Sequence, residues 1–242
     1  MLGLRSRADL PEWEVHPNGS SSFENTKKTV ALFVLLRPWA EANAVAIVYP
    51  ARKEKEMKFS ELVLIRQSVR SYQKKPVENE KLRVLIESIR LAPSASNSQP
   101  WTLVIVDEPG LKDKVARATF SSTISFNKFA IEAPVIAVLT VEQPRAITQV
   151  GGWIKEREFP LIDIGIAAEH FCLQAADLGL GTCILGWFDE AMIKKLLEIP
   201  RATRIGLLIT LGYAADGYPM RPKIRKPAEA MSCFNRYAPV PD

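Results

Sequence analysis

A short loop of polar side chains is the part of this sequence best suited to chemistry. Between Pro93 and Pro100 the chain reads Ser-Ala-Ser-Asn-Ser-Gln, and Trp101 follows the second proline. Hydroxyl and amide groups at this density can donate and accept hydrogen bonds along the polar edge of a heterocycle, while the prolines restrict how far the loop can move. The same composition is typical of a solvated turn, so the loop indicates a ligand site only together with other motifs.

Two basic segments, far apart in the sequence, offer the charge that a phosphate needs. Residues 66–70 read Arg-Gln-Ser-Val-Arg, where two guanidiniums flank a hydroxyl, and residues 221–225 read Arg-Pro-Lys-Ile-Arg. Lys223 and Arg225 would point to the same side of an extended segment. Guanidinium, ammonium and hydroxyl donors suit a phosphomonoester. Either segment taken alone is more typical of solvated surface.

A third segment places glycines around a short apolar run. Residues 179–187 read Gly-Leu-Gly-Thr-Cys-Ile-Leu-Gly-Trp. The Gly-x-Gly pair follows a predicted helix and not a strand, so we interpret it as a helix cap followed by a core strand, and not as a dinucleotide-binding fingerprint. Gly186 comes after that strand, where the lack of a side chain lets a flat ligand approach the backbone.

The sequence offers no set of side chains that would carry out covalent chemistry by itself. It has no apparent Ser-His-Asp or Cys-His arrangement, no HExxH or P-loop motif, and three widely spaced cysteines without a CxxC pair. His170 falls in an apolar helical pattern and is interpreted as a core or interface residue. We therefore expect no metal site, and an enzyme with this sequence would leave the difficult chemistry to a bound cofactor.

Composition and charge narrow the class of protein. The chain has 242 residues with 47% hydrophobic content, enough for one sizeable core, and a formal net charge of +5. Acidic and basic residues are interleaved, which argues against a nucleic-acid partner and suits an anionic small ligand. No apolar run reaches the length of a membrane span, and no signal peptide is recognised, so we expect a cytoplasmic protein without a membrane partner.

The first 56 residues differ from the rest of the chain. Residues 1–56 contain a Ser-Ser-Ser run, several prolines and a charged stretch, and regular hydrophobic periodicity begins near Met57. We expect an appended, largely disordered extension over 1–56 and one compact domain over 57–242. A start codon assigned too far upstream would produce the same appearance.

Hydrophobic periodicity in the compact domain predicts helices interspersed with short buried strands. Apolar residues at i, i+3, i+4 and i+7 predict the helix over 78–91, and Gly179 is the expected cap of a long helix. Fully apolar runs predict buried strands. The predicted helices cover 59–66, 78–91, 110–118, 161–178 and 190–197, the predicted strands cover 102–106, 134–139, 182–185 and 205–211, and 142–160 is predicted to be a loop.

Taken in this order, the motifs resemble those of the nitroreductase family of flavin enzymes, over about residues 58–235. The resemblance implies an α+β fold with a central, mostly antiparallel β-sheet flanked by helices, and a domain-swapped-type homodimer with FMN sites at its interface. FMN is the implied cofactor, and NADH or NADPH the implied co-substrate. The implied FMN-binding residues are Arg66, Gln67, Ser68, Arg70, Pro93, Ser94, Ala95, Asn97, Leu185, Gly186, Lys223 and Arg225.

The resemblance also implies which part of the cofactor each of these residues would contact. The residues that would hold the phosphate and the ribityl chain are Arg66, Ser68, Arg70, Lys223 and Arg225. The partner subunit would supply Pro93, Ser94, Ala95 and Asn97. The backbone at Leu185 and Gly186 would lie near the isoalloxazine ring. Either Lys223 or Arg225 would stabilise the negative charge of the reduced flavin. No catalytic side chain is implied, because the flavin carries the chemistry.

The implied reaction is a ping-pong transfer of hydride from NADH or NADPH, by way of the flavin, to a nitroaromatic, a quinone or a similar small molecule. One alternative is another flavin reaction, such as dehalogenation, oxidation of a heterocycle or destruction of flavin. A second is a non-catalytic FMN-binding protein, and a third is an interaction protein with a coincidental basic face. Phe126 and Trp153 could line the acceptor pocket, although core or interface packing is the commoner role of such residues.

Overall fold

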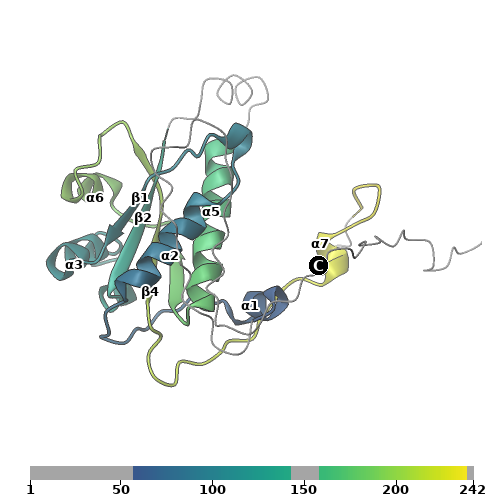
Figure 1. Ribbon diagram of the computed structural model, residues 1–242, viewed down its shortest axis with the longest axis horizontal. Helices are drawn as coiled ribbons and strands as arrows, with labels where there is room; N and C mark the ends of the chain where they lie inside the picture. Colours follow the sequence, from purple (N-terminus) through teal and green to yellow (C-terminus); the bar gives the residue numbers. More distant parts are fainter. Residues whose placement is uncertain (1–56, 143–157, 239–242) are drawn as a thin grey trace, which may run out of the picture. The chain divides into compact units, whose positions relative to one another are not determined.

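The structure is a computed structural model that describes residues 57–142 and 158–238. In this part of the chain, four strands form one sheet in the order β1-β2-β4-β3, and every neighbouring pair is antiparallel. The expected α+β fold with a mostly antiparallel sheet is confirmed (Figure 1). The strands are β1 (Leu103–Val106), β2 (Val135–Val141), β3 (Gly181–Leu185) and β4 (Arg204–Gly212).

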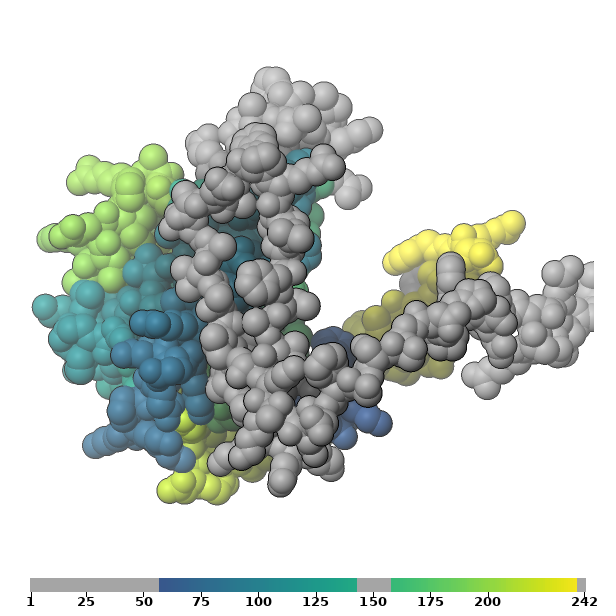
Figure 2. Space-filling view, in the orientation of Figure 1, coloured from purple at the N-terminus to yellow at the C-terminus, as the bar shows by residue number. Residues whose placement is uncertain are grey.

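Helices cover both faces of the sheet. One face packs against α2 (Asn79–Arg90) and α5 (Phe159–Asp177), and the other packs against α3 (Pro109–Arg117) and α6 (Glu190–Leu196). α3 and α6 lie side by side, as the ribbon and the space-filling view both show (Figures 1 and 2). The short helices α1 (Phe59–Ile65) and α7 (Ala228–Met231) precede and follow this three-layer arrangement in the sequence.

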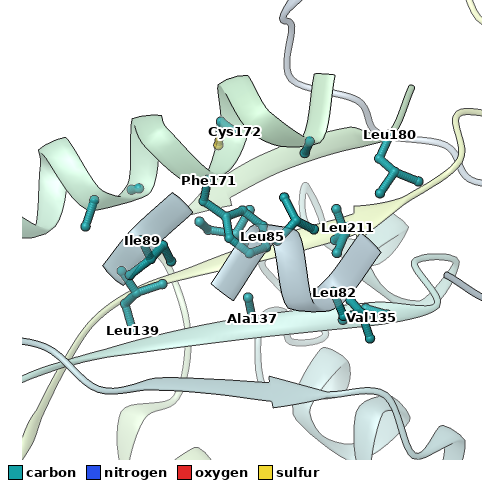
Figure 3. Packing of buried hydrophobic residues seen from close by; sticks show 14 of the residues in the cluster. Leu82, Leu85, Ile89, Val135, Ala137, Leu139, Phe171, Cys172, Leu180 and Leu211 are labelled. Atoms are coloured by element: carbon teal, nitrogen blue, oxygen red, sulfur yellow. The ribbon is translucent and has the colours of Figure 1, made fainter. Parts of the chain in front are cut away.

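The core lies on both sides of β2, the strand whose side chains are most completely buried. Ala137 and Leu139 pack with α2 and α5, while Ile136 and Val138 point to the opposite face toward α3 and α6. Phe171 of α5 is fully buried in the first of these clusters. Figure 3 shows this cluster filling the space between the two helices and the sheet. Burial on both faces explains why β2 reads as a continuous apolar run.

The end of α5 has the geometry that the sequence predicts for a glycine cap. Gly179 has φ = 73°, in the left-handed region. Its amide donates to the Ala176 carbonyl at 3.0 Å, and the Leu180 amide donates to the Ala175 carbonyl at 2.8 Å. These two bonds satisfy carbonyls that a helix end leaves without partners. The chain then turns directly into β3.

All predicted helices and strands of the compact domain are present, and their ends differ by no more than two residues. α5 begins at Phe159 and not at residue 161, because Pro160 fits the first turn of a helix, where its missing N–H costs nothing. The short 3₁₀ turns Ala95–Asn97 and Lys128–Ile131 and the helix α7 were not predicted. The predicted N-terminal extension, most of the predicted loop over 142–160 and Trp153 lie outside the described residues.

The cysteines and His170 occupy structural positions. Cys172 and Cys183 are buried, Cys233 is exposed, and all three are free thiols. Nδ1 of His170 lies 3.3 Å from the Ser88 carbonyl, which ties α5 to α2 and agrees with a packing role. None of the helices in the two described ranges is long and apolar enough to cross a membrane.

Candidate functional site

The first basic segment leaves α1 and runs along β3. From Arg66 the backbone is extended. The Val69 amide donates to the Thr182 carbonyl at 2.9 Å, and Ser68 forms a parallel bridge with the same residue. A Cβ at Gly181 would lie 2.6 Å from Cγ2 of Val69, so the segment can approach β3 this closely only because residue 181 is glycine.

Arg66 is held by a carboxylate from α5. Its Nε donates to Oε1 of Glu169 at 3.1 Å, and its Nη2 donates to Oε2 at 2.6 Å. Desolvation works to lower the pKa of Arg66, but the hydrogen bonds and charge of Glu169 outweigh it, so the pKa is raised and the guanidinium stays charged. This side-on pairing uses one edge of the guanidinium and leaves the Nη1 edge for another anion.

Lys223 brings the second basic segment to the same place. Its Nζ donates a hydrogen bond to the backbone carbonyl of Arg66. Desolvation and the positive charges of Arg66 and Arg225 lower the pKa of Lys223, and the nearby Glu169 carboxylate opposes this effect. Cations that repel one another in this way mark a concentration of positive charge that a bound anion would relieve.

Tyr218 and Gln67 join the two segments by hydrogen bonds. Oη of Tyr218 accepts hydrogen bonds from the Arg70 amide at 3.0 Å and from Nη2 of Arg221 at 2.6 Å. Oε1 of Gln67 accepts from the Arg221 amide at 3.1 Å, and its Nε2 donates to the Pro219 carbonyl at 3.1 Å. The joined segments form one surface, the basic cradle, which consists of Arg66, Arg70, Arg221, Lys223 and Arg225.

The end of β3 exposes its backbone beside aromatic side chains. Leu185 is buried, whereas a Cβ at Gly186 would meet nothing within 4 Å in the described part of the chain. Trp187 and Phe126 are both exposed, and their rings meet edge to face with centroids 6.4 Å apart. Nδ2 of Asn127, a buried residue, donates to the Trp187 carbonyl at 3.2 Å and fixes this turn. The arrangement fits the approach of a flat ligand to the Gly186 backbone.

The polar loop has a strained backbone and lies against the first part of α5. Ser96, Asn97 and Gln99 have φ of 53°, 51° and 48°, in the left-handed region that residues with a side chain seldom adopt. The Ala95 amide donates to both carboxylate oxygens of Asp163, at 3.1 and 3.2 Å. Asp163 is 3% exposed.

Within one chain, the structure brings three of the four segments together and leaves the polar loop apart. In the described residues, the hydrogen bonds of residues 94–99 run within the loop or to Asp163, and none reaches the basic cradle. The anchor Asp163 precedes Glu169 by six residues on α5, a separation of about 9 Å along a helix axis. The expected supply of this loop by a partner subunit therefore remains a prediction.

Three residues of the site were not predicted from the sequence: Asp163, Glu169 and Tyr218. Asp163 could have been recognised from the sequence, because it lies at helical spacing from the buried residues Ala167 and Phe171. This spacing places a carboxylate on the apolar face of a helix. Glu169 and Tyr218 carried no such signal. Their roles depend on which residues the fold places beside them.

Comparisons with known proteins agree with this geometry. A family model described as the nitroreductase family matches residues 63–213. A curated relative from Thermus thermophilus, named NADH dehydrogenase, is 30% identical, and the match covers 64% of this chain and 87% of the relative. A relative from Bacillus subtilis, named FMN reductase (NAD(P)H), is 26% identical, with 70% of each protein covered. A solved structure of a nitroreductase family protein from Streptococcus pneumoniae shares 28% identity and has a TM-score of 0.60, covering 72% of this chain and 98% of that one.

Proposed function

The chain belongs to the nitroreductase family, and on that premise we propose that it is an FMN-dependent oxidoreductase that takes hydride from NADH or NADPH and reduces a nitroaromatic, a quinone or a similar small molecule. The observation that carries the proposal is the contact between Lys223 and Arg66, because it gathers cations from both ends of the domain into the basic cradle. The relatives named NADH dehydrogenase and FMN reductase support the donor and the cofactor.

The basic cradle fits the phosphate of FMN. The free edge of Arg66 can donate two hydrogen bonds in parallel, and Lys223 and Arg225 add point charge beside it. Ser68 lies two residues from Arg66 in the same extended segment, so its side chain would lie on the same side and add a hydroxyl donor. A phosphate would also relieve the repulsion that lowers the pKa of Lys223.

The backbone at the end of β3 fits the ring of the flavin. When bound, FMN supplies the exchange of hydride that no side chain of this domain supplies. The chain contributes position and charge: the open backbone at Gly186 lets a planar ring approach, and Leu185 anchors the turn in the core. Either Lys223 or Arg225 would supply the positive charge that stabilises the anionic reduced flavin.

We assign the donor and the acceptor to the same open face in turn, which is the structural requirement of a ping-pong reaction. The exposed pair Trp187 and Phe126 would form one wall of that face. Aromatic walls favour planar partners such as a nicotinamide, a nitroaromatic or a quinone. The domain would therefore select its acceptor by shape more than by specific hydrogen bonds.

A homodimer would complete the proposed site. The polar loop with Pro93, Ser94, Ala95 and Asn97 does not reach the basic cradle of its own chain, which supports its supply to a second subunit. Exposed apolar side chains on α1 and in the C-terminal segment, Phe59, Leu64, Ile224 and Phe234, provide surface for such an interface. Sedimentation of the purified protein at several concentrations would measure its mass directly.

An absorbance spectrum of the purified protein tests the proposed function. We expect an oxidised-flavin spectrum that bleaches under anaerobic conditions when NADH or NADPH is added, and that returns when a quinone follows. A yellow protein that neither nucleotide bleaches would favour a non-catalytic FMN-binding protein. A colourless protein that cannot be reconstituted with FMN would contradict the proposal.

A further inference from the structure

The polar loop holds a backbone conformation that its own sequence does not favour. Three of the four residues from Ser96 to Gln99 have positive φ, and none of the three is glycine. Each such residue costs free energy that the surrounding structure must supply. The loop is therefore held in place by specific contacts, and its conformation depends on them.

Contacts inside the loop account for part of this restraint. Oγ of Ser94 accepts from the Gln99 amide at 2.9 Å, and Nε2 of Gln99 donates to Oδ1 of Asn97 at 2.9 Å. These bonds close the loop on itself, but they do not fix it to the domain. Oγ of Ser98 is buried and has no hydrogen-bond partner among the described residues. The contacts within the loop thus leave this hydroxyl unsatisfied and account for only part of the restraint.

Asp163 provides the connection to the domain. Its carboxylate is almost fully buried, and in the described part of the chain it accepts a hydrogen bond from the Ala95 amide alone. Burying a carboxylate that has one backbone donor as its partner reduces the free energy of unfolding. An apolar residue at this position would pack against the sheet without that loss. The packing of α5 therefore does not explain the carboxylate, whereas restraint of the loop does.

We propose that Asp163 is a positioning residue for the flavin: it holds the Ala95 amide, and through it keeps residues 94–99 in the conformation that contacts the isoalloxazine ring. The inference rests on the proposed function for its ligand, but the restraint itself exists without one. Asp163 touches neither the flavin nor the substrate, and it acts through the backbone. Its effect should therefore fall on the ring and not on the phosphate.

Two substitutions remove opposite sides of this one hydrogen bond. Asp163→Ala removes the acceptor. Ala95→Pro removes the donor, and the extended backbone of Ser94, with φ of −146° and ψ of 156°, is compatible with a following proline. Asp163→Asn keeps one acceptor oxygen without the charge and should restore part of the restraint. Glu108→Ala is the matched control, since Glu108 also accepts from backbone amides, at the start of α3.

Hydrogen exchange in the flavin-free protein measures the restraint directly. We expect the hydrogen-bonded amides of Asn97, Ser98 and Gln99 to exchange at least tenfold faster in Asp163→Ala and Ala95→Pro, as loss of a hydrogen bond to a charged group predicts. Amides of β2 and β4 should keep their wild-type rates, and Glu108→Ala should leave the loop unchanged. Asp163→Asn keeps the acceptor but loses its charge, so its rates should fall between those of wild type and Asp163→Ala. Loop amides that exchange at the wild-type rate in Asp163→Ala or in Ala95→Pro would overturn the inference.

Binding of FMN and of riboflavin, which lacks the phosphate, measures the consequence. We expect both Kd values to rise by the same factor, about ten- to a hundredfold, so that the ratio of the two stays at the wild-type value. A change confined to FMN would overturn the inference, because it would place the effect at the phosphate. If the wild-type protein binds no flavin, the proposed function fails, and the exchange rates still decide whether Asp163 holds the loop.

Discussion

The carboxylate of Glu169 accepts two hydrogen bonds from the guanidinium of Arg66, from Nε at 3.1 Å and from Nη2 at 2.6 Å. The plane of the guanidinium is therefore set by α5 before any ligand binds. Lys223 holds the carbonyl of the same residue, so both the side chain and the backbone of Arg66 are restrained. Such preorganisation lowers the entropy that a phosphate ligand must lose on binding.

This relationship predicts that lysine cannot replace Arg66. In Arg66→Lys, one ammonium would have to serve both the Glu169 carboxylate and the phosphate, and it lacks the two parallel donors of a guanidinium. We expect the Kd for FMN to rise about tenfold, the effect of roughly one charge-assisted hydrogen bond. Titration of flavin-free protein with FMN, followed by quenching of the flavin fluorescence, measures this change.

Arg90→Lys is the matched control, because Arg90 makes the same side-on pair with Glu87 on α2, outside the proposed site. It should leave the FMN affinity unchanged. Arg66→Lys with wild-type affinity would show that only the charge at this position matters, and that the orientation set by Glu169 does not.

A second prediction concerns the whole phosphate site. Removing cations from both basic segments in Arg66→Ala with Arg225→Ala should give protein that purifies without flavin, because the phosphate would lose its bidentate donor and one of its flanking charges. The ratio of flavin to protein absorbance measures occupancy. Arg204→Ala, which removes an exposed cation at the first residue of β4, should retain the cofactor. Stoichiometric FMN in the double variant would remove both residues from the site.

The sequence predicted the elements well because local signals determine them. Apolar periodicity marked α2, and an unbroken apolar run marked β2, which is buried on both faces. Glycine at the end of α5 marked its cap, since the left-handed conformation there favours that residue. The antiparallel character of the sheet came from the resemblance, and the order of its strands was not predicted, because short strands of this kind do not specify their neighbours.

Only those site residues could be predicted from the sequence whose side chains are charged or polar and stand in a short motif. The cations of the basic cradle are visible in the sequence, but the pairing of Arg66 with Glu169 bridges 103 positions and depends on how α1 meets α5. Likewise, the contact of Tyr218 with Arg70 follows from the path of the chain after β4. Partners at such separations leave no periodic signal, so sequence patterns reveal the charges and not their arrangement.

A third prediction tests the open backbone at the end of β3. In Gly186→Val, the new Cβ would have open space around it, since in the described part of the chain nothing beyond residues 185 and 187 lies within 4 Å of it. We expect the free energy of unfolding to change by about 1 kcal/mol or less, as for surface positions in general. Binding of FMN and riboflavin should both weaken strongly, because the side chain would fill the space of the ring. Thermal unfolding of the flavin-free protein and flavin titration separate the two effects.

Gly181→Ala provides the opposite case on the same strand. Its Cβ would lie 2.6 Å from Cγ2 of Val69, so the substitution should destabilise the fold, by about 1–3 kcal/mol as overpacking does. If Gly186→Val bound flavin normally, the ring could not lie against this backbone, and the assignment of Leu185 and Gly186 to the cofactor would be wrong.

The fourth prediction concerns alkaline pH. Burial raises the pKa of the Cys172 thiol from 9.0 to about 11, although a hydrogen bond with Thr182 works in the opposite direction. The unfolded chain therefore releases this proton at lower pH than the folded protein does. The free energy of unfolding should be insensitive to this thiol below its unfolded pKa, and should fall as the pH rises from about 9 to about 11. A two-unit shift corresponds to about 3 kcal/mol at most.

Chemical denaturation at a series of pH values measures this fall. Burial also raises the pKa of Tyr72 and of Cys183, so both groups make the free energy of unfolding fall more steeply as the pH rises. Cys172→Ala should therefore reduce the slope without abolishing it, whereas Cys233→Ala should leave it unchanged, because Cys233 is exposed. An equal slope in wild type and Cys172→Ala would contradict the prediction, because it would mean that the Cys172 thiol ionises as readily in the folded protein as in the unfolded chain, in spite of its burial between α5 and the sheet.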